Sequence, residues 1–272
     1  MRSLGQAVRR TGILAAELPM PWPSLSDHRI TFRRGQASLL AAAPGGGKTI
    51  LALAYAVESK VPTLFISADT DINTMATRAA AMVTGWSQDQ VEAAGLQSQV
   101  VQEALAELSH IRWADDNQPT VEDIYLEVKA YAEVFGCFPD LVVIDNLIDV
   151  QVEAKADKDW ANTRAVVDGL KRLARESEAH VLILAHATGK YENGNEPIPL
   201  GGLEWKPGKN VELVLTMYWG EGHELRICPV KNRSGKASAD GSIHATLYAE
   251  LAHCSIHDPG TGKRWVIGRK PE

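Results

Sequence analysis

One short segment combines the residue types that bind a nucleoside triphosphate. Residues 42–49 read AAPGGGKT. Glycines let backbone N–H groups close around phosphate oxygens, and the N-terminus of a following helix adds a favourable dipole. The lysine can reach the β- and γ-phosphates, and the threonine hydroxyl can bind Mg²⁺. We therefore predict ATP and Mg²⁺ as cofactors, bound by the loop residues Pro44, Gly45, Gly46, Gly47, Lys48, Thr49 and Ile50.

A second acidic element lies downstream of this loop. Residues 140–145 read DLVVID, a run that is almost wholly apolar until its final carboxylate. In proteins with a phosphate-binding loop, an aspartate in such a position holds the metal ion together with the loop hydroxyl. A carboxylate at a strand end carries little information alone, because strand ends are often polar, but here the glycine loop precedes it. We therefore predict Thr49 and Asp145 as the metal-binding residues.

The elements that must position these groups alternate between strand and helix. An apolar run at 36–43 precedes the glycines, and residues 49–59 place apolar side chains on one stripe of a helix. Further strands are predicted at 61–67, 110–114, 140–145, 180–185, 211–218, 224–230 and 242–250. Helices are predicted at 72–83, 87–107 with a break near Gly95, 121–134 and 161–175. This alternation predicts an α/β fold with a mostly parallel sheet flanked by helices, followed by antiparallel strands and a C-terminal hairpin.

Composition narrows the class of protein without identifying a partner. The 272 residues are 45% hydrophobic and 23% charged, an ordinary globular composition. The three cysteines form no CxxC pair, which argues against a disulfide framework or a thiolate zinc site. The formal net charge of −6 argues against a surface coated in positive charge, although a ring or groove can still concentrate lysine and arginine locally. No apolar run is long enough for a transmembrane helix, so we expect a cytoplasmic protein.

Six segments spread over residues 30–251 match one protein family in their order and type. They read APGGGKT, LFISAD, LVVIDNL, VVDGLKRLARES, VLILAHATGK and VKNRSGK. Together they resemble the RecA-like ATPase domain of DnaB-type replicative helicases and of compact, plasmid RepA-type hexameric helicases. The glycine loop alone indicates only an NTPase, whereas its combination with VKNRSG after a strand is much more specific.

The resemblance implies a RecA-like P-loop NTPase fold and an ATP-dependent motor that acts on single-stranded or forked DNA as a hexameric homo-oligomer. We expect an N-terminal segment at 1–27, with a possible subunit-docking helix, and the ATPase domain at 28–272. The short stretch before the phosphate loop suggests a phage- or plasmid-encoded replication or recombination protein, in the cytoplasm of a bacterial host.

The resemblance also implies roles for residues outside the phosphate loop. Lys231 and Arg233 match the lysine and arginine that reach the ATP of a neighbouring subunit, where an arginine supplied in trans stabilises the transferring phosphoryl group. His186 matches a polar residue that senses the γ-phosphate. Asp69 stands where the family has the glutamate that activates the attacking water. Aspartate is one methylene shorter, which puts the rate of hydrolysis in doubt, and Asp71 is the next candidate for this role.

Two loops would face the DNA in such a ring. The first, at 150–160, offers Lys155 and Lys158. The second, at 188–209, is polar and rich in glycine and proline. It offers Lys190, Trp205, Lys206 and Lys209. Ammonium groups that follow a phosphate backbone, with an aromatic ring for stacking, suit single-stranded nucleic acid without sequence readout.

Two other functions stay open at this point. Asp69, Asp71, Asp145 and Asp149 could position two metal ions for cleavage of branched DNA, although no separate nuclease motif is present. Alternatively, the protein could use ATP only to assemble on DNA, as recombination mediators do, and the shorter Asp69 is the best support for that hypothesis. The sequence does not decide between DNA and RNA.

Overall fold

A computed structural model of the chain describes residues 16–116, 118–152, 159–187, 189–203 and 210–260. Within these residues a nine-stranded sheet has the order β3-β2-β4-β5-β1-β6-β7-β8-β9. The strands are β1 (Ala37–Ala42), β2 (Thr63–Ser67), β3 (Ile111–Asp115), β4 (Leu141–Asp145), β5 (His180–His186), β6 (Leu213–Trp219), β7 (Glu224–Asn232), β8 (Ala245–Glu250) and β9 (Ser255–His257). The first six strands in this order, from β3 at the edge to β6, pair in parallel, whereas β7, β8 and β9 are added by antiparallel pairing.

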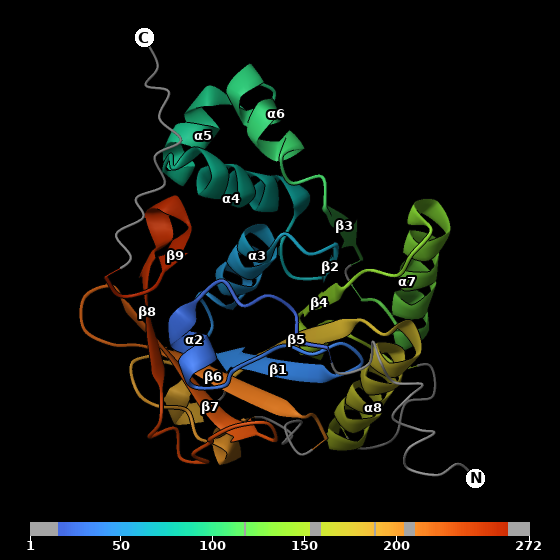
Figure 1. Cartoon of the computed structure of the whole chain (residues 1–272), viewed down its shortest axis with the longest axis vertical. Coiled ribbons are helices and arrows are strands. Elements are labelled where there is room, and N and C mark those ends of the chain that lie inside the picture. The colour runs from blue at the N-terminus through green and yellow to red at the C-terminus, as the bar shows by residue number, and fades with distance from the viewer. Residues whose placement is uncertain (1–15, 117, 153–158, 188, 204–209, 261–272) are drawn as a thin grey trace.

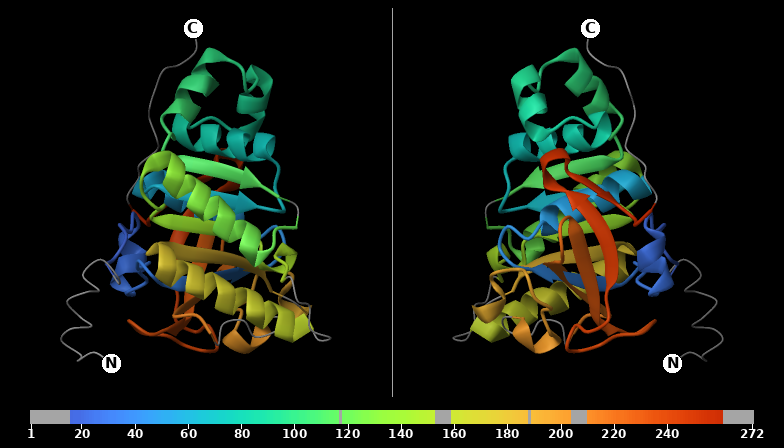
Figure 2. Two further views of the ribbon diagram at one scale, coloured as in Figure 1. Left: turned by 90° about the vertical axis from the view of Figure 1, so that its right-hand side faces the viewer. Right: turned by 90° about the vertical axis from the view of Figure 1, so that its left-hand side faces the viewer.

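Helices cover both faces of the sheet, as Figure 1 and Figure 2 show. Helices α7 (Val121–Phe135) and α8 (Asp159–Ser177) lie over one face, and α3 (Lys48–Ser59) lies over the other. The short helix α2 (Pro23–Asp27) also lies on the α3 side. Beyond α3, helices α4 (Ile72–Thr84), α5 (Gln88–Ala94) and α6 (Gln99–Ala106) project at one end of the molecule. Each layer buries the apolar stripe of a helix against the sheet.

The strands read as continuous apolar runs because both of their faces are buried. In β1, Leu40 packs with the α3 side of the core, whereas Leu39 and Ala41 pack with the α7 and α8 side. Successive side chains of a strand point to opposite faces, so one strand contributes to both hydrophobic cores. Burial on both faces is the expected environment of parallel strands with crossover helices.

The register of the parallel strands sets where the polar strand ends meet. Ala42, the last residue of β1, pairs with His186 of β5, and Ser67 of β2 pairs with Asp145 of β4. The loop that follows β1 and the polar residues that end β2, β4 and β5 therefore share one edge of the sheet. Ligands of open α/β sheets bind at this carboxyl edge.

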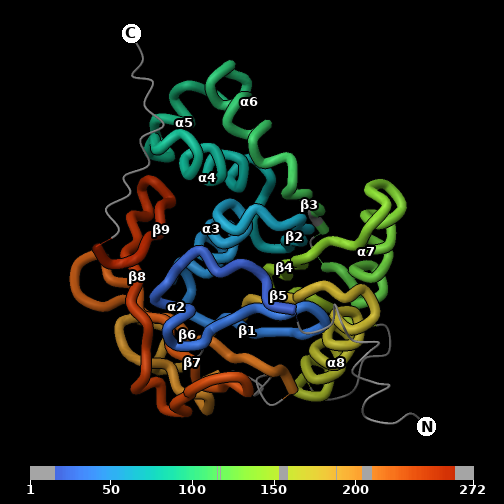
Figure 3. Tube along the Cα trace, viewed as in Figure 1, coloured from blue at the N-terminus to red at the C-terminus, as the bar shows by residue number. Residues whose placement is uncertain are grey.

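The C-terminal strands turn back toward the helical end of the molecule. The short 3₁₀ turn η5 (Leu251–His253) between β8 and β9 contacts α4 and α5, and the tube in Figure 3 shows these segments side by side. The side-chain amide of Gln88 donates a hydrogen bond of 2.9 Å to the Leu251 carbonyl. The antiparallel strands thus close over the side of the sheet that carries α3.

The predicted fold class is confirmed: the sheet is mostly parallel, flanked by helices, and ends in antiparallel strands. The predicted break near Gly95 separates α5 from α6. Leu18, Trp22 and Leu25 are buried in the same core as α3. The predicted docking helix falls largely on residues 1–15, and the second arm of the predicted C-terminal hairpin on residues 261–272; both lie outside the described residues.

Candidate functional site

The glycine loop joins the end of β1 to the start of α3 and is shaped by positions without side chains. Gly45 and Gly47 adopt left-handed backbone conformations, with φ of 67° and 90°. A Cβ added at Gly46 would lie 2.9 Å from the Ala43 carbonyl oxygen, which is closer than real Cβ atoms approach. Ile50, in the first turn of α3, is buried in the hydrophobic core on the α3 side of the sheet. The loop therefore presents backbone N–H groups at the N-terminus of a twelve-residue helix, the arrangement that binds phosphate.

Thr49 and Asp145 meet at this edge as the sequence predicts. The Thr49 hydroxyl donates a hydrogen bond of 2.8 Å to Oδ2 of Asp145, which is 1% exposed. Burial raises the pKa of Asp145, while the Thr49 hydrogen bond and the Lys48 charge oppose that rise. The other carboxylate oxygen, Oδ1, is buried without a hydrogen-bond partner among the described residues. A buried carboxylate oxygen without a hydrogen-bond partner costs free energy unless a water molecule or an ion binds it.

Lys48 and His186 face each other across the loop. The Lys48 ammonium lies 3.1 Å from Nδ1 of His186, and the lysine is 6% exposed. Burial lowers the pKa of Lys48, and the carboxylates of Asp145 and Asp69 oppose this effect. Burial and the Lys48 charge lower the pKa of His186, which favours the neutral imidazole, and Nδ1 of a neutral imidazole can accept a hydrogen bond from the ammonium. His186 thereby holds the lysine at the phosphate loop.

Asp69 and Asp71 have different environments despite their closeness in sequence. Asp69 is exposed after β2, and its charge acts on Lys48, Asp145 and His186. Asp71 instead caps α4: its carboxylate accepts hydrogen bonds from the Asn73 and Thr74 backbone N–H groups and from the Thr74 hydroxyl. Of these two carboxylates, only that of Asp69 is both free of such capping bonds and close enough to influence the loop.

Two residues at the site were missed by the sequence analysis. The Asn146 side-chain nitrogen lies 3.4 Å from Nε2 of His186, and its Oδ1 accepts a hydrogen bond from the Ile148 N–H. The Arg78 charge acts on Asp145, and its Nε is buried without a partner among the described residues. Arg78 is the one charged residue of α4, and this single cation in an alanine-rich helix is the sequence signal for it.

Lys231 and Arg233 lie far from the phosphate loop of their own chain. The antiparallel pairing places Asn232 opposite Leu213, at the edge where the parallel strands begin. Arg233 is mostly exposed and forms an ion pair of 3.8 Å with Glu212. Burial and the Arg233 charge lower the pKa of Lys231. Because β1 has six residues at about 3.3 Å each, the two edges are separated by roughly 16–20 Å.

The predicted DNA-facing residues are only partly described. Lys190 is exposed in the 3₁₀ turn η2 (Gly189–Tyr191), with its ammonium 4.8 Å from the centre of the Tyr191 ring. Lys155 and Lys158 lie outside the described residues, as do Trp205, Lys206 and Lys209. The loop of η2 packs on the phosphate loop, because a Cβ added at Gly194 would lie 3.0 Å from that of Ala43.

The donors at this edge fit Mg²⁺ and a triphosphate. A hydroxyl and a carboxylate with one unpartnered oxygen are the hard oxygen ligands that Mg²⁺ prefers. The glycine cradle, with a buried lysine beside it, fits phosphate oxygens. Within the described part of the chain no cluster of three or more His, Cys, Asp or Glu side chains forms a metal site.

Comparison with known proteins assigns these features to one family. Residues 21–200 match the family described as the DnaB-like helicase C-terminal domain. The chain is 34% identical over 250 residues to the Gene 65 protein of Mycobacterium phage L5, with 89% of this chain and 93% of that protein covered. The Gene 65 protein of Mycobacterium phage D29 is 36% identical over 217 residues, with 77% and 93% covered.

Solved structures show the same fold at low sequence identity. A DnaB-like replicative helicase, solved in a study of its interactions with primase, matches with a TM-score of 0.78 at 18% identity, covering 94% of this chain and 68% of that one. A KaiC-like protein of Pyrococcus horikoshii OT3 matches with a TM-score of 0.60 at 15% identity, covering 89% and 98%. Among the helices described, none has the length and apolarity needed to cross a membrane.

Proposed function

The chain belongs to the family of DnaB-like helicase C-terminal domains, as the sequence resemblance predicted, and we propose that it is an ATP-dependent motor acting on single-stranded or forked DNA. The observation that carries this proposal is the arrangement at the carboxyl edge of the sheet. There the buried Lys48 lies at the glycine loop and the Thr49 hydroxyl contacts the Asp145 carboxylate, so the group types that bind the phosphates and the metal ion of ATP are together.

At the carboxyl edge of the sheet, some residues bind the nucleotide and others take part in its hydrolysis. The loop N–H groups and Lys48 hold the β- and γ-phosphates, while Thr49 and Asp145 hold Mg²⁺, which when bound neutralises phosphate charge. Asp69 accepts a proton from the attacking water, directly or through a second water because its side chain is short. His186 contacts Lys48, so it loses this contact when the ammonium turns to the γ-phosphate, and its position thereby depends on whether the γ-phosphate is present.

The cations needed to complete the site come from another subunit in this proposal. Lys231 and Arg233 lie at the opposite edge of the sheet from their own loop, so they cannot contact their own nucleotide. In a head-to-tail ring, the edge of one subunit that carries Lys231 and Arg233 faces the edge of its neighbour that carries the phosphate loop. This arrangement brings the two cations to the neighbour's ATP. We infer a homo-oligomeric, hexameric ring from family membership and this separation.

Contact with DNA is assigned to the segments after β4 and β5. Lys190 is exposed on the loop that packs against Ala43, and the other predicted lysines and Trp205 belong to the same two segments. Loops that contact the nucleotide site on one side and DNA on the other can be moved by hydrolysis. Exposed ammonium groups suit binding to a phosphate backbone without sequence readout.

The test is the rate of Mg²⁺-dependent ATP hydrolysis with and without single-stranded DNA, for the intact protein and for Lys48→Ala. We expect DNA to raise the rate and Lys48→Ala to abolish it. Lys129→Ala is the matched control, because Lys129 is an exposed lysine on α7. A rate that DNA leaves unchanged contradicts the motor.

Two outcomes would favour the other functions. Cleavage of forked DNA that survives Lys48→Ala would favour a metal-dependent nuclease. Normal ATP affinity with very slow turnover would favour a mediator that uses ATP to assemble on DNA, and the short side chain of Asp69 is consistent with slow turnover.

A further inference from the structure

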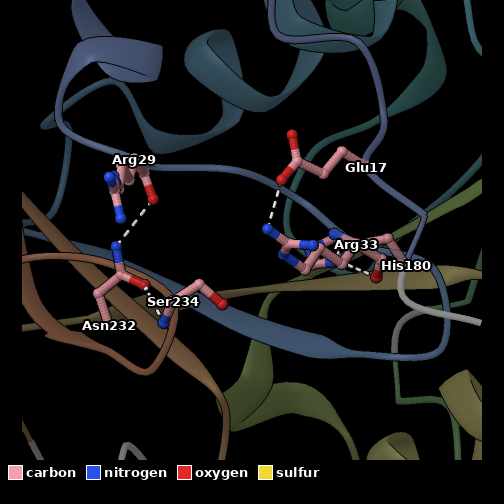
Figure 4. A network of polar contacts seen from close by, with 6 residues as sticks. All are labelled: Glu17, Arg29, Arg33, His180, Asn232 and Ser234. Atoms are coloured by element: carbon pink, nitrogen blue, oxygen red, sulfur yellow. Dashed lines mark hydrogen bonds and ion pairs between the residues drawn. The ribbon is translucent and has the colours of Figure 1, made fainter.

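The turn that carries Arg233 is fixed to the segment before β1. The side-chain amide of Asn232 donates a hydrogen bond of 2.9 Å to the Arg29 carbonyl, and its Oδ1 accepts one of 2.9 Å from the Ser234 N–H. A Cβ added at Gly235 would lie 2.7 Å from that of Arg29, so the two backbones are in close contact. Figure 4 shows Arg29, Asn232 and Ser234 linked in this way. Arg29 and residues 232–235, the turn that carries Arg233, therefore form one packed unit.

A cavity of about 600 Å³ lies beside this unit. Its wall has an apolar part, Leu18, Pro19 and Met20, and a polar part that includes Ser26, Thr31 and Ser234. Arg29 and Ser234 in its wall adjoin Asn232, which pairs with Leu213, so this part of the cavity is at the edge where the parallel strands begin, opposite the phosphate loop.

The two arginines of the cavity wall differ in their side-chain contacts. Arg33 forms an ion pair with Glu17, as Figure 4 shows. Arg29 is exposed, and among the described residues its guanidinium forms neither an ion pair nor a hydrogen bond with a side chain. A guanidinium with unused donors recognises phosphate oxygens in bidentate geometry. The charge available to a ligand here is therefore positive.

The backbone of Arg29 ends helix α2. Its φ is 52°, in the left-handed region that favours glycine, and the N–H groups of Arg29 and Ile30 donate to the Ser26 and Leu25 carbonyls, the pair of bonds that commonly closes a helix. Glycine would keep this conformation without a side chain, so Arg29→Gly is compatible with the backbone.

We propose that Arg29 is a further catalytic residue that acts in trans, contacting the triphosphate of the neighbouring subunit beside Lys231 and Arg233. The inference rests on the proposed function, because it requires the edge that carries Arg233 to meet a neighbour's phosphate loop. Arg29 contacts Asn232, which pairs with Leu213 at the edge where the parallel strands begin, so Arg29 lies at the opposite edge from the phosphate loop of its own chain. The ligand class is the polyphosphate of a nucleoside triphosphate.

The first test is Arg29→Gly, which removes the guanidinium and relieves the backbone. We expect kcat/KM for ATP to fall by about 10- to 100-fold, the value of a charge-assisted hydrogen bond, with an unchanged or raised Tm. Lys60→Gly is the matched control, because Lys60 is also an exposed cation in a left-handed conformation, with φ of 54°. It should relieve the backbone and leave ATP hydrolysis unchanged.

The second test mixes Arg29→Gly with Lys48→Ala subunits, each of which is weakly active or inactive alone. In a head-to-tail ring about a quarter of the interfaces of an equimolar mixture join an intact phosphate loop to an intact Arg29, so activity should return to roughly that level. Recovery is the result expected only of a residue that acts across the interface.

Three results would overturn the inference. Wild-type turnover in Arg29→Gly, or a loss that mixing does not restore, shows that Arg29 does not act in trans. A loss of self-association without nucleotide shows that it contacts protein. The same mixing experiment with Arg233→Ala tests the proposed function separately. If mixing does not restore the activity of Arg233→Ala, the trans arrangement itself is wrong. If mixing restores the activity of Arg233→Ala but not that of Arg29→Gly, only the role of Arg29 is wrong.

Discussion

Lowering the pH should destabilise the fold through His180. This residue is 1% exposed, stacks on Phe32 with ring centres 4.6 Å apart, and places Nδ1 3.0 Å from the Arg33 carbonyl oxygen. Its Nε2 is buried without a partner among the described residues, so the fold offers nothing to stabilise a second proton there. Burial lowers the pKa of His180 from 6.5 to about 4.

The pH dependence of the unfolding free energy follows from the difference in the pKa of His180 between the folded and unfolded states. Because the pKa is lower in the folded state, the stabilisation is complete above pH 6.5 and is lost as the pH falls toward 4. Between pH 7.5 and pH 5 the unfolded state takes up a proton that the folded state does not. With these two pKa values the free energy of unfolding should fall by about 2 kcal/mol from this group alone.

The assay is urea unfolding of the nucleotide-free protein at pH 7.5 and pH 5, with the intact chain compared to His180→Asn at equal protomer concentration. Asparagine keeps a polar group near Arg33 but does not titrate. The difference in unfolding free energy between the two proteins should shift by about 2 kcal/mol between the two pH values, because other titrating groups are common to both. His223→Gln, which replaces an exposed histidine, is the control. A difference that stays constant with pH refutes the reasoning.

Two further predictions concern the nucleotide site. Gly46→Ala should weaken ATP binding by at least about tenfold, because the new methyl group would be 2.9 Å from the Ala43 carbonyl oxygen and the loop must shift. The control is Gly201→Ala, because the space around Gly201 is open. Nucleotide titration measures the ATP affinity of both variants. Asp69→Asn should lower kcat by roughly 100-fold with little change in ATP affinity, whereas Asp69→Glu should raise kcat because the longer side chain reaches the water. Equal single-turnover rates for the intact chain and both of these variants would exclude Asp69 as the base.

The elements of the fold were predictable because their signals are local. The run Leu141–Asp145 is apolar over its length, and α8 repeats Val166, Leu170 and Leu173 on one face, so both were identified within two residues of their ends. The capped start of α7 at Thr120 likewise follows from neighbouring residues, since the capping box is formed with Asp123. Each of these signals lies within a few residues of the structure it specifies.

The contacts that build the site were not predictable in the same way. His186 reaches Lys48 across 138 positions, and Asn232 reaches Arg29 across 203. These pairs depend on the strand order, in which β1 lies between β5 and β6, and no local pattern specifies that order. The phosphate loop is the exception, because one continuous segment supplies its glycines, lysine and threonine.

The phosphate loop and the segment after β5 are tied together at two points, which bears on how a motor of this kind would couple hydrolysis to DNA. The Ala187 N–H donates a hydrogen bond of 2.8 Å to the end of β1, and Gly194 packs against Ala43. The Gly194 carbonyl also accepts a hydrogen bond of 2.8 Å from the Trp219 N–H, which attaches this residue to β6. Lys190 lies in the chain between Ala187 and Gly194. Because close-packed contacts shift between discrete arrangements rather than deform smoothly, movement of the loop on loss of the γ-phosphate must displace this segment. In the proposed motor, nucleotide state is therefore passed to the DNA-facing side by direct contact.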